Sequence, residues 1–399
     1  MFNSVENAWV IKIPNDFSFL TNPNEAIDVL KSLVEVSTKN PRELIFDHSD
    51  CVKIDLCAST AFDIIALGLR AEWAMSGKFH LRGLFPRNEN ALAIIKSMGI
   101  THHLNIRGAE PVPAVDQLFL KFELIRGRKA KAKRPACSSD QERAASALAK
   151  YLNQCFETAA GFSFKKEGTR QIVSWAGEII TNAEEHSDQG EWYVMAFMKP
   201  IAVGNQTPQN EPSIIGECQM VILNVGRSIH ESLSSSTTPN DTHEQIQELV
   251  TKHSAKKYFL EPRYSPEDLW TLYALQDGVS RFSPTPGKTD RGKGTVRMIQ
   301  AFQTLGDTLD VNHAPVMALV SGTSRIKFTK KYKMMAVEME GGSRQIIAFN
   351  ATNSLDERPD GEHVHSLEGK FPGTLLSFNF FIDKKYLETK IAKLNDKVK

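Results

Sequence analysis

The residues best suited to chemistry lie in the stretch 178–187, which reads Glu-Ile-Ile-Thr-Asn-Ala-Glu-Glu-His-Ser. Residues four positions apart on a helix share one face, so Glu178, Asn182 and His186 are expected to project together. A carboxamide oxygen is a suitable ligand for Mg²⁺, and a carboxylate beside it can orient or deprotonate a water molecule. By spacing alone the same pattern also fits an exposed polar face. The stretch therefore predicts either a magnesium-assisted site or a solvated helix surface.

Three further segments place glycine beside groups that can hold a ligand. A strand-like run ends at residues 224–229, which read Asn-Val-Gly-Arg-Ser-Ile. Residues 291–295 read Arg-Gly-Lys-Gly-Thr and precede a helical stretch, where free backbone N–H groups and the charge of Lys293 would suit a phosphate. Residues 371–374 read Phe-Pro-Gly-Thr and lead into the last predicted strand. Each segment alone is weak evidence, because turns often contain glycine.

In this order, the four segments resemble those of the ATP-binding domain of histidine kinases, gyrase-type topoisomerases, chaperone ATPases and mismatch-repair ATPases, the GHKL superfamily. Stretch 178–187 looks like the N box, in a form closest to that of bacterial anti-sigma-factor serine kinases. Residues 224–229 and 291–295 occupy the places of the two glycine boxes, and 373–374 resembles the Gly-Thr pair that opens the closing strand. The resemblance covers residues 143–383.

The resemblance implies a role for each matching residue, with ATP and Mg²⁺ as cofactors. Glu178 would be the catalytic base or water polariser, and Asn182 would be the protein ligand of Mg²⁺. Asn224 would face the adenine edge with support from Thr374, and the segment at about 230–290 would be the ATP lid. The residues implied to contact nucleotide are Asn182, His186, Asn224, Gly226, Ser228, Gly292, Lys293, Gly294, Thr295 and Thr374.

Two positions depart from the family pattern. The family's aspartate in the first glycine box is Asn224 here, and the second glycine of that box is Ser228. Asparagine can accept a hydrogen bond through its oxygen but also offers N–H donors, so a guanine oxygen is not excluded although ATP is favoured. Ser228 should stiffen the hinge of the lid and lower turnover without abolishing binding.

The elements that must position these residues form an α+β sandwich in the second half of the chain. Ser139 and Glu142 have capping-box spacing ahead of a helix, and a longer helix is expected at about 168–185. Strand-like runs are expected at 192–198, 218–223, 316–321, 334–337, 345–349 and 375–382. This order predicts helices on one face of a mostly antiparallel sheet. Residues 384–399 have helical spacing and are expected to form a C-terminal helix.

The first part of the chain, residues 1–125, has a βαβ rhythm that predicts a small α/β domain. It resembles, more weakly, the STAS fold of anti-sigma-factor antagonists, with Ser59 at the regulatory serine position. That resemblance makes Ser59 a candidate phosphosite, whereas a serine that merely caps a helix is the alternative. Residues 126–142 begin with a basic run between Arg126 and Arg134, which predicts a solvated linker between the domains.

Composition narrows the function classes. The chain has 399 residues, and its 48 Lys and Arg nearly balance its 47 Asp and Glu, giving a net charge of +1. Such a charge excludes a global field that attracts nucleic acid or an anionic membrane, so any nucleic-acid contact would be local to the basic run. The five cysteines are scattered, which favours neither a disulfide framework nor a zinc site. With neither a signal-like start nor a membrane-length apolar run, we expect a cytoplasmic protein.

Three functions are compatible with these features. The favoured one is a Mg-dependent ATPase that acts as a nucleotide-controlled switch in regulation or in stress or defence signalling. It would contact a protein partner or self-associate on binding ATP. The second is a serine/threonine protein kinase of the anti-sigma type, acting on a STAS-domain partner or on its own Ser59. The third is a nucleotide-responsive binding module without catalysis.

Overall fold

A computed structural model of the chain describes residues 8–39, 41–74, 80–98, 120–128, 139–187, 190–203, 213–235, 238–254, 264–279, 294–304, 308–310, 312–339 and 342–398. For residues 72–74, 186, 254, 339, 342 and 394–398 it describes the backbone alone. The chain forms two compact units. The first contains Met1–Glu123 with two short strand pieces, Met195–Lys199 and Gln219–Val221, and the second contains the remaining residues.

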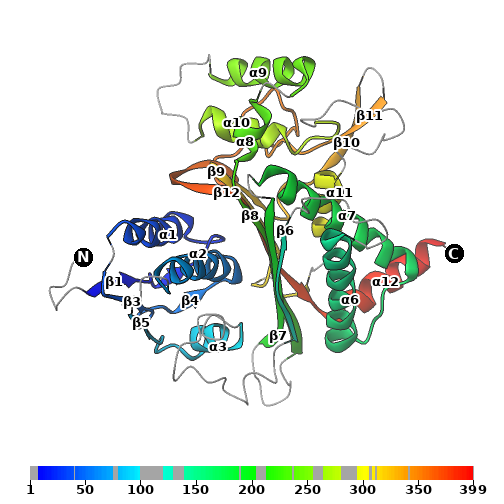
Figure 1. Cartoon of the computed structure of the whole chain (residues 1–399). Coiled ribbons are helices and arrows are strands. Elements are labelled where there is room, and N and C mark those ends of the chain that lie inside the picture. The colour runs from blue at the N-terminus through cyan, green and yellow to red at the C-terminus, as the bar shows by residue number, and fades with distance from the viewer. Residues whose placement is uncertain are drawn as a thin grey trace. The chain divides into compact units, whose positions relative to one another are not determined.

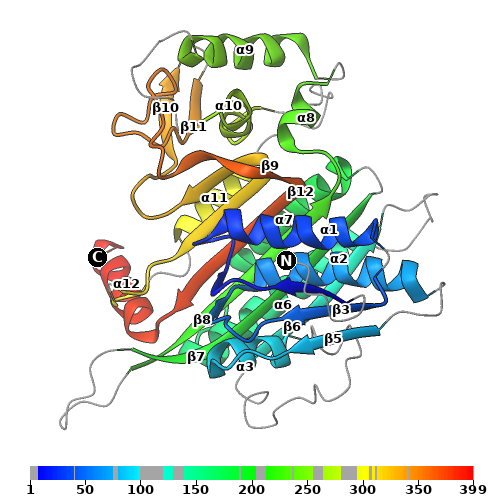
Figure 2. The same ribbon diagram turned by 90° about the vertical axis from the view of Figure 1, so that its left-hand side faces the viewer.

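The first unit begins with a small parallel α/β arrangement. Its main sheet has the strand order β1-β3-β5, and the short strands β2 and β4 pair with each other in parallel. The elements are β1 (Ala8–Lys12), β2 (Asp16–Phe17), α1 (Pro23–Ser37), β3 (Glu43–Asp47), β4 (Lys53–Ile54), α2 (Leu56–Ala74), β5 (His80–Leu84) and α3 (Glu89–Ser97). Figure 2 shows α1 and α2 side by side. The predicted α/β rhythm is therefore present, while the finer likeness to a STAS domain stays a prediction.

Aromatic packing and a buried cap hold α2 in place. The ring of Phe62 packs edge-on against Phe46 and Phe17, with centroids 4.6 Å and 6.1 Å apart. The N-terminal cap of α2 is Asp55, whose Oδ1 accepts a hydrogen bond of 2.7 Å from the Ala58 amide. Ser59 thus lies inside the first turn and does not cap the helix. Its side chain is 1% exposed, so phosphorylation of Ser59 would require the start of α2 to open.

The second unit contains most of a five-stranded antiparallel sheet in the order β6-β7-β8-β12-β9, of which short pieces of β6, β7 and β8 are grouped with the first unit. Its strands are β6 (Leu120–Arg128), β7 (Glu191–Val203), β8 (Ser213–Val225), β9 (Val316–Phe328) and β12 (Val364–Ile382). The helices beside this sheet are α6 (Asp140–Ala160), α7 (Lys166–His186), α11 (Gly294–Thr304) and α12 (Lys384–Val398). Figure 1 shows these four helices on one side of the sheet, so the predicted α+β class is confirmed.

Local sequence explains the two helices nearest the candidate site. Ser139 and Glu142 form the predicted capping box, in which each side chain accepts a 3.2 Å hydrogen bond from the other's backbone amide. Helix α6 then ends at Gly161, which adopts the left-handed conformation with φ 74°. Helix α7 buries one apolar face through Ile172, Trp175, Ala176, Ile179 and Ile180. Packing of α6 against α7 therefore leaves the polar residues of α7 on another face.

The expected linker is shorter than predicted. Arg126 and Arg128 belong to strand β6, where Nη2 of Arg126 lies 2.8 Å from Oε1 of Glu191. Residues 139–142 already form the cap and first turn of α6. The remaining basic residues, 129–134, lie outside the described residues. Two arginines of the basic run are therefore strand residues, and both form an ion pair with Glu191 in the neighbouring strand.

The segment predicted as a lid folds around a hydrophobic core of its own. It contains α8 (Ile229–Leu233), α9 (Asn240–Ser254) and α10 (Pro266–Tyr273), and Figure 1 shows these helices grouped near the hairpin of β10 (Met335–Met339) and β11 (Gly342–Ile346). The core consists of Leu233, Ile246, Val250, Tyr264, Leu269, Trp270 and Tyr273. We call residues 229–279 the helical segment. Its shared core packs α8, α9 and α10 against one another. The predicted lid residues 280–290 lie outside the described residues.

Candidate functional site

Two segments far apart in the sequence meet at Glu178 of α7. Its Oε1 lies 2.5 Å from Nη1 of Arg297, a residue of α11 that is 119 positions away. Gly294, the first residue of α11, also lies close to Glu178. A Cβ added at Gly294 would overlap the carboxylate of Glu178 and lie 2.7 Å from the Cβ of Glu178. Only glycine fits such an approach without a shift of the neighbouring atoms. The N-terminus of α11 therefore contacts the predicted base directly.

The other polar residues of α7 lie farther along the same helix. Asn182 is exposed, one turn beyond Glu178, and the side chain of His186 lies outside the described part of the chain. Ser187, the C-terminal cap residue, donates a 2.9 Å hydrogen bond from Oγ to the carbonyl oxygen of Val225. This bond ties the end of α7 to the end of β8, where the first glycine-containing segment lies.

A second convergence joins the end of β8 to the start of the closing strand segment. Gly373 has φ 138°, and a Cβ added there would overlap the carbonyl oxygen of Asn224 and lie 3.0 Å from the Cα of Val225. The Gly226 amide donates a 3.1 Å hydrogen bond to the carbonyl oxygen of Pro372. Asn224 itself is 1% exposed, and its Nδ2 has no hydrogen-bond partner among the described residues. A buried amide donor without an acceptor is destabilising unless a ligand supplies one.

Thr374 is linked to the helical segment through Ser321, a residue of β9 that the sequence analysis missed. The register of the sheet places Ser321 opposite Thr374, and their hydroxyl oxygens lie 2.8 Å apart. The Ile229 amide at the start of α8 donates a 2.8 Å hydrogen bond to Ser321 Oγ. The only sequence signal was a small polar residue inside an apolar strand, which carries no information about its distant partners.

Ser228 has a different role from the predicted one. Its Oγ accepts a 3.1 Å hydrogen bond from the Glu231 amide, and Oε2 of Glu231 accepts a 2.8 Å bond from the Ser228 amide. This capping box starts α8, and Ser228 is fully buried. A hydrogen bond from the Lys370 ammonium lowers the pKa of Glu231, which keeps the box ionised. The side chain of Ser228 therefore acts as a helix cap, and its predicted effect on a lid hinge stays a prediction.

The predicted phosphate loop is seen only at its end. Gly292 and Lys293 lie outside the described residues. Gly294 and Thr295 form the first turn of α11, the helix predicted to follow this segment. Arg297, which sequence reasoning missed, lies one turn farther along α11. The sequence showed only that a basic residue follows the glycines by a few positions. The helix N-terminus predicted to hold phosphate therefore exists and lies against Glu178.

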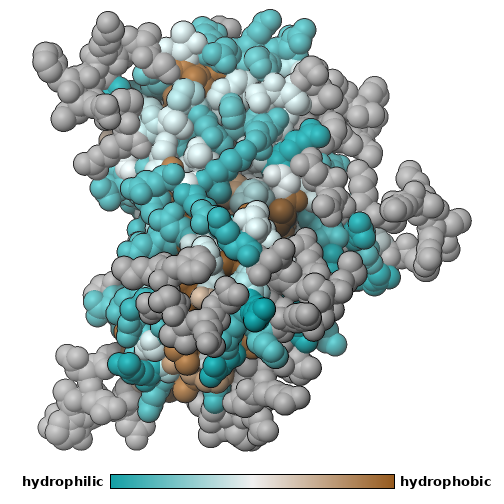
Figure 3. Space-filling view, turned by 60° about the vertical axis from the view of Figure 1, so that its left-hand side comes forward, coloured by the Kyte–Doolittle hydropathy of each residue, from teal (hydrophilic) through white to brown (hydrophobic). Residues whose placement is uncertain are grey.

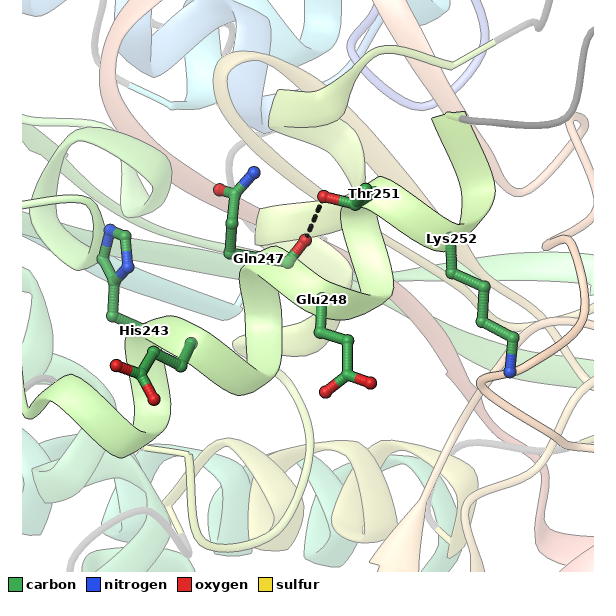
Figure 4. Close-up of a pocket in the computed structure, with 6 residues that line it drawn as sticks. His243, Gln247, Glu248, Thr251 and Lys252 are labelled. Atoms are coloured by element: carbon green, nitrogen blue, oxygen red, sulfur yellow. Dashed lines mark hydrogen bonds between the residues drawn. The ribbon is translucent and has the colours of Figure 1, made fainter.

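One surface hollow lies away from these residues. The hollow has a volume of about 600 Å³. Figure 4 shows its lining side chains on a single helix, α9. The lining residues are His243, Glu244, Gln247, Glu248, Thr251 and Lys252. The Thr251 hydroxyl donates back to the Gln247 carbonyl oxygen at 2.7 Å, a bond within the helix. Among the described residues, one helix face provides the lining, so this hollow is shallow there and includes none of the predicted site residues that the structure describes.

Charge and hydropathy give the site its chemical character. Figure 3 shows a face on which hydrophilic residues predominate and hydrophobic ones form small separate areas.

Within the described residues, no three His, Cys, Asp or Glu side chains gather as a metal site. In the same part of the chain, every helix is too short or too polar to cross a bilayer. The candidate site is built from the ion pair of Glu178 with Arg297, together with amide side chains, hydroxyls and glycine backbone.

Comparison of the chain with protein-family models, curated proteins and solved structures finds no match. The resemblance to GHKL domains therefore rests on the four sequence segments alone.

Proposed function

We propose that the second unit binds ATP with Mg²⁺ and hydrolyses it slowly, as a nucleotide-controlled switch. The observation that carries the proposal is the contact of Gly294 and Arg297 with Glu178. This contact places the N-terminus of α11, which is predicted to hold phosphate, beside the carboxylate that is predicted to orient or deprotonate water. The second convergence, between Asn224 and Gly373, supports the same arrangement at the base-binding side.

The residues present are suited to a nucleotide. The unpaired Nδ2 of Asn224 offers a buried donor to the edge of a purine base. The N-terminus of α11 begins at Gly294, and its first N–H groups carry the positive end of the helix dipole, which favours phosphate oxygens. Asn182 is exposed and would hold Mg²⁺ through its carbonyl oxygen. The metal, when bound, neutralises phosphate charge.

The role of Glu178 in this proposal is to orient a water molecule and take a proton from it. The carboxylate is 30% exposed, so water can reach it, and Arg297 holds it in one position. The arginine donates a hydrogen bond to Oε1, and so occupies one of the two carboxylate oxygens. Loosening of this pair would free the base, which provides a means of keeping turnover slow.

The test is ATP hydrolysis by purified protein. Wild-type protein should release phosphate in a Mg-dependent reaction, and Glu178→Gln should slow it by about 100-fold or more while nucleotide still binds. Glu167→Gln is the matched control, because Glu167 lies on the same helix with its side chain 70% exposed and 3.7 Å from Arg170. Equal rates for wild type and Glu178→Gln would refute the catalytic role of Glu178. Binding of nucleotide without any turnover would favour the non-catalytic module.

A further inference from the structure

Ser321 has contacts on both sides of the candidate site. It is fully buried in β9, and its Oγ lies 2.8 Å from Oγ1 of Thr374 and 3.3 Å from the carbonyl oxygen of Gly373. The same Oγ accepts a 2.8 Å hydrogen bond from the Ile229 amide. One hydroxyl therefore contacts the predicted base-binding residues of β12 and the first residue of α8.

This hydroxyl can adopt two hydrogen-bond patterns. A serine hydroxyl has one donor and two acceptor positions. Ser321 can donate to Gly373 while accepting from Thr374, which then has no proton left for a ligand. Alternatively, Ser321 donates to Thr374, and Thr374 becomes free to donate elsewhere. A ligand that accepts a hydrogen bond from Thr374 selects the second pattern, and the Gly373 carbonyl then loses its bond to Ser321.

The residues that follow Ser321 contact a second helix of the helical segment. Gly322 has φ 61°, and a Cβ added there would overlap Oε1 of Glu267 on α10 and lie 3.0 Å from the Cβ of Ser228. Thr323 donates from Oγ1 to Oε2 of Glu267 at 2.6 Å. Residues 321–323 therefore bind the starts of both α8 and α10, which share one hydrophobic core with α9.

We propose that Ser321 is a positioning residue that couples nucleotide binding near Asn224 and Thr374 to the position of the helical segment. The inference rests on the proposed function, because the coupled ligand is the nucleotide. It adds the route: the base-side hydroxyl of Thr374, the Ser321 hydroxyl and the N-terminus of α8. A change in the hydrogen bond between Thr374 and Ser321 alters the bond that Ser321 accepts from the Ile229 amide. The shared core transmits that change to α9 and α10.

Hydrogen exchange of backbone amides tests this coupling in the full chain. Each variant is compared with and without Mg-ATP at a concentration that calorimetry shows to be saturating. In the wild-type protein, Mg-ATP should slow exchange in α8 and α9 by about tenfold. Ser321→Ala should reduce that effect to about twofold or less, and Ser321→Thr, which retains the hydroxyl, should restore it.

Ser377→Ala is the matched control, because Ser377 is a buried serine of the paired strand β12, opposite Ala318. Its exchange response should equal that of wild type. Should Ser321→Ala fail to fold, Thr374→Val removes the hydroxyl at the other end of the bond and should uncouple the segment equally. If Mg-ATP slows exchange in α8 and α9 of the folded Ser321→Ala or Thr374→Val variant as much as in wild type, the coupling is refuted while the proposed function stands. A wild-type protein that binds no ATP refutes both the coupling and the proposed function.

Discussion

Oε1 of Glu178 lies 2.5 Å from Nη1 of Arg297, and this ion pair joins the middle of α7 to the first turns of α11. The two side chains are 30% and 37% exposed, so the pair is partly screened by solvent. Its main consequence is geometric: it fixes a carboxylate beside the helix N-terminus that begins at Gly294.

A double-mutant cycle measures this pair. Glu178→Gln, Arg297→Gln and the double variant, unfolded in urea, should give a coupling energy of about 0.5–1 kcal/mol, because partly exposed pairs contribute little. The coupling should decrease in high salt. Strictly additive effects of the two substitutions at low salt would contradict the observed pairing.

Gly294→Ala should destabilise the second unit by about 1–3 kcal/mol, because the added methyl group overlaps Glu178. Gly177→Ala is a matched control one residue before Glu178. A Cβ at position 177 would lie 3.8 Å from the Cβ of Ala145, which is an ordinary contact. That substitution should stabilise α7 by up to about 1 kcal/mol. Equal effects of the two substitutions on the urea midpoint would contradict the close approach of α11.

Asn224→Asp should change the choice of nucleotide. Asparagine can donate to a guanine oxygen or to an adenine ring nitrogen, whereas ionised aspartate can only accept. The variant should therefore bind GTP about tenfold more weakly relative to ATP than the wild-type protein does. Competition of both nucleotides against a fluorescent analogue provides the ratio. An unchanged ratio would show that Asn224 does not contact the base.

The first unit should lose stability in mild acid because of His48. Burial lowers the pKa of His48 from 6.5 to about 4, and its side chain is 6% exposed. The unfolded chain therefore binds more protons between these two values, so the contribution is complete above pH 6.5 and is lost as the pH falls toward 4. At pH 5 the loss is about 2 kcal/mol relative to pH 7.5.

His48→Phe removes that titration and retains a ring beside Phe62, whose centroid lies 6.0 Å from that of His48. The difference between the unfolding free energies of wild type and variant should change by about 2 kcal/mol between pH 7.5 and pH 5. Taking this difference cancels the other titrating groups, including Asp63, whose pKa burial raises. A constant difference across this pH range would argue against a neutral buried His48.

Local patterns predicted much of the fold. The capping box at Ser139, the amphipathic helix around Glu178 and the strand runs of the second unit are all present, because each depends on spacing within a short window. Patterns of this kind contain no information on tertiary partners. They therefore missed Arg297 and Ser321, which matter through residues 119 and 53 positions away.

Competing local roles explain the other differences. A serine before a helix can serve as a cap or a regulatory site, and at α2 the cap is Asp55 while Ser59 is buried. At Ser228 the reverse applies, since the residue expected at a ligand-binding hinge caps α8. The polar composition of the helical segment did not indicate the hydrophobic core that contains Trp270. A few well-spaced apolar residues are enough to pack three short helices, and they change the overall composition little.

The central claim is that one nucleotide binds at the site formed by α7, α11 and the end of β8. Calorimetric titration of ATP into the full chain, with and without Mg²⁺, tests it most directly. We predict one molecule per chain, with Mg-dependent affinity that Asn182→Ala weakens by about tenfold or more and that Asn312→Ala, at an exposed loop position, leaves unchanged. A wild-type dissociation constant above about 1 mM with Mg²⁺ present, or equal binding by Asn182→Ala, would contradict the account.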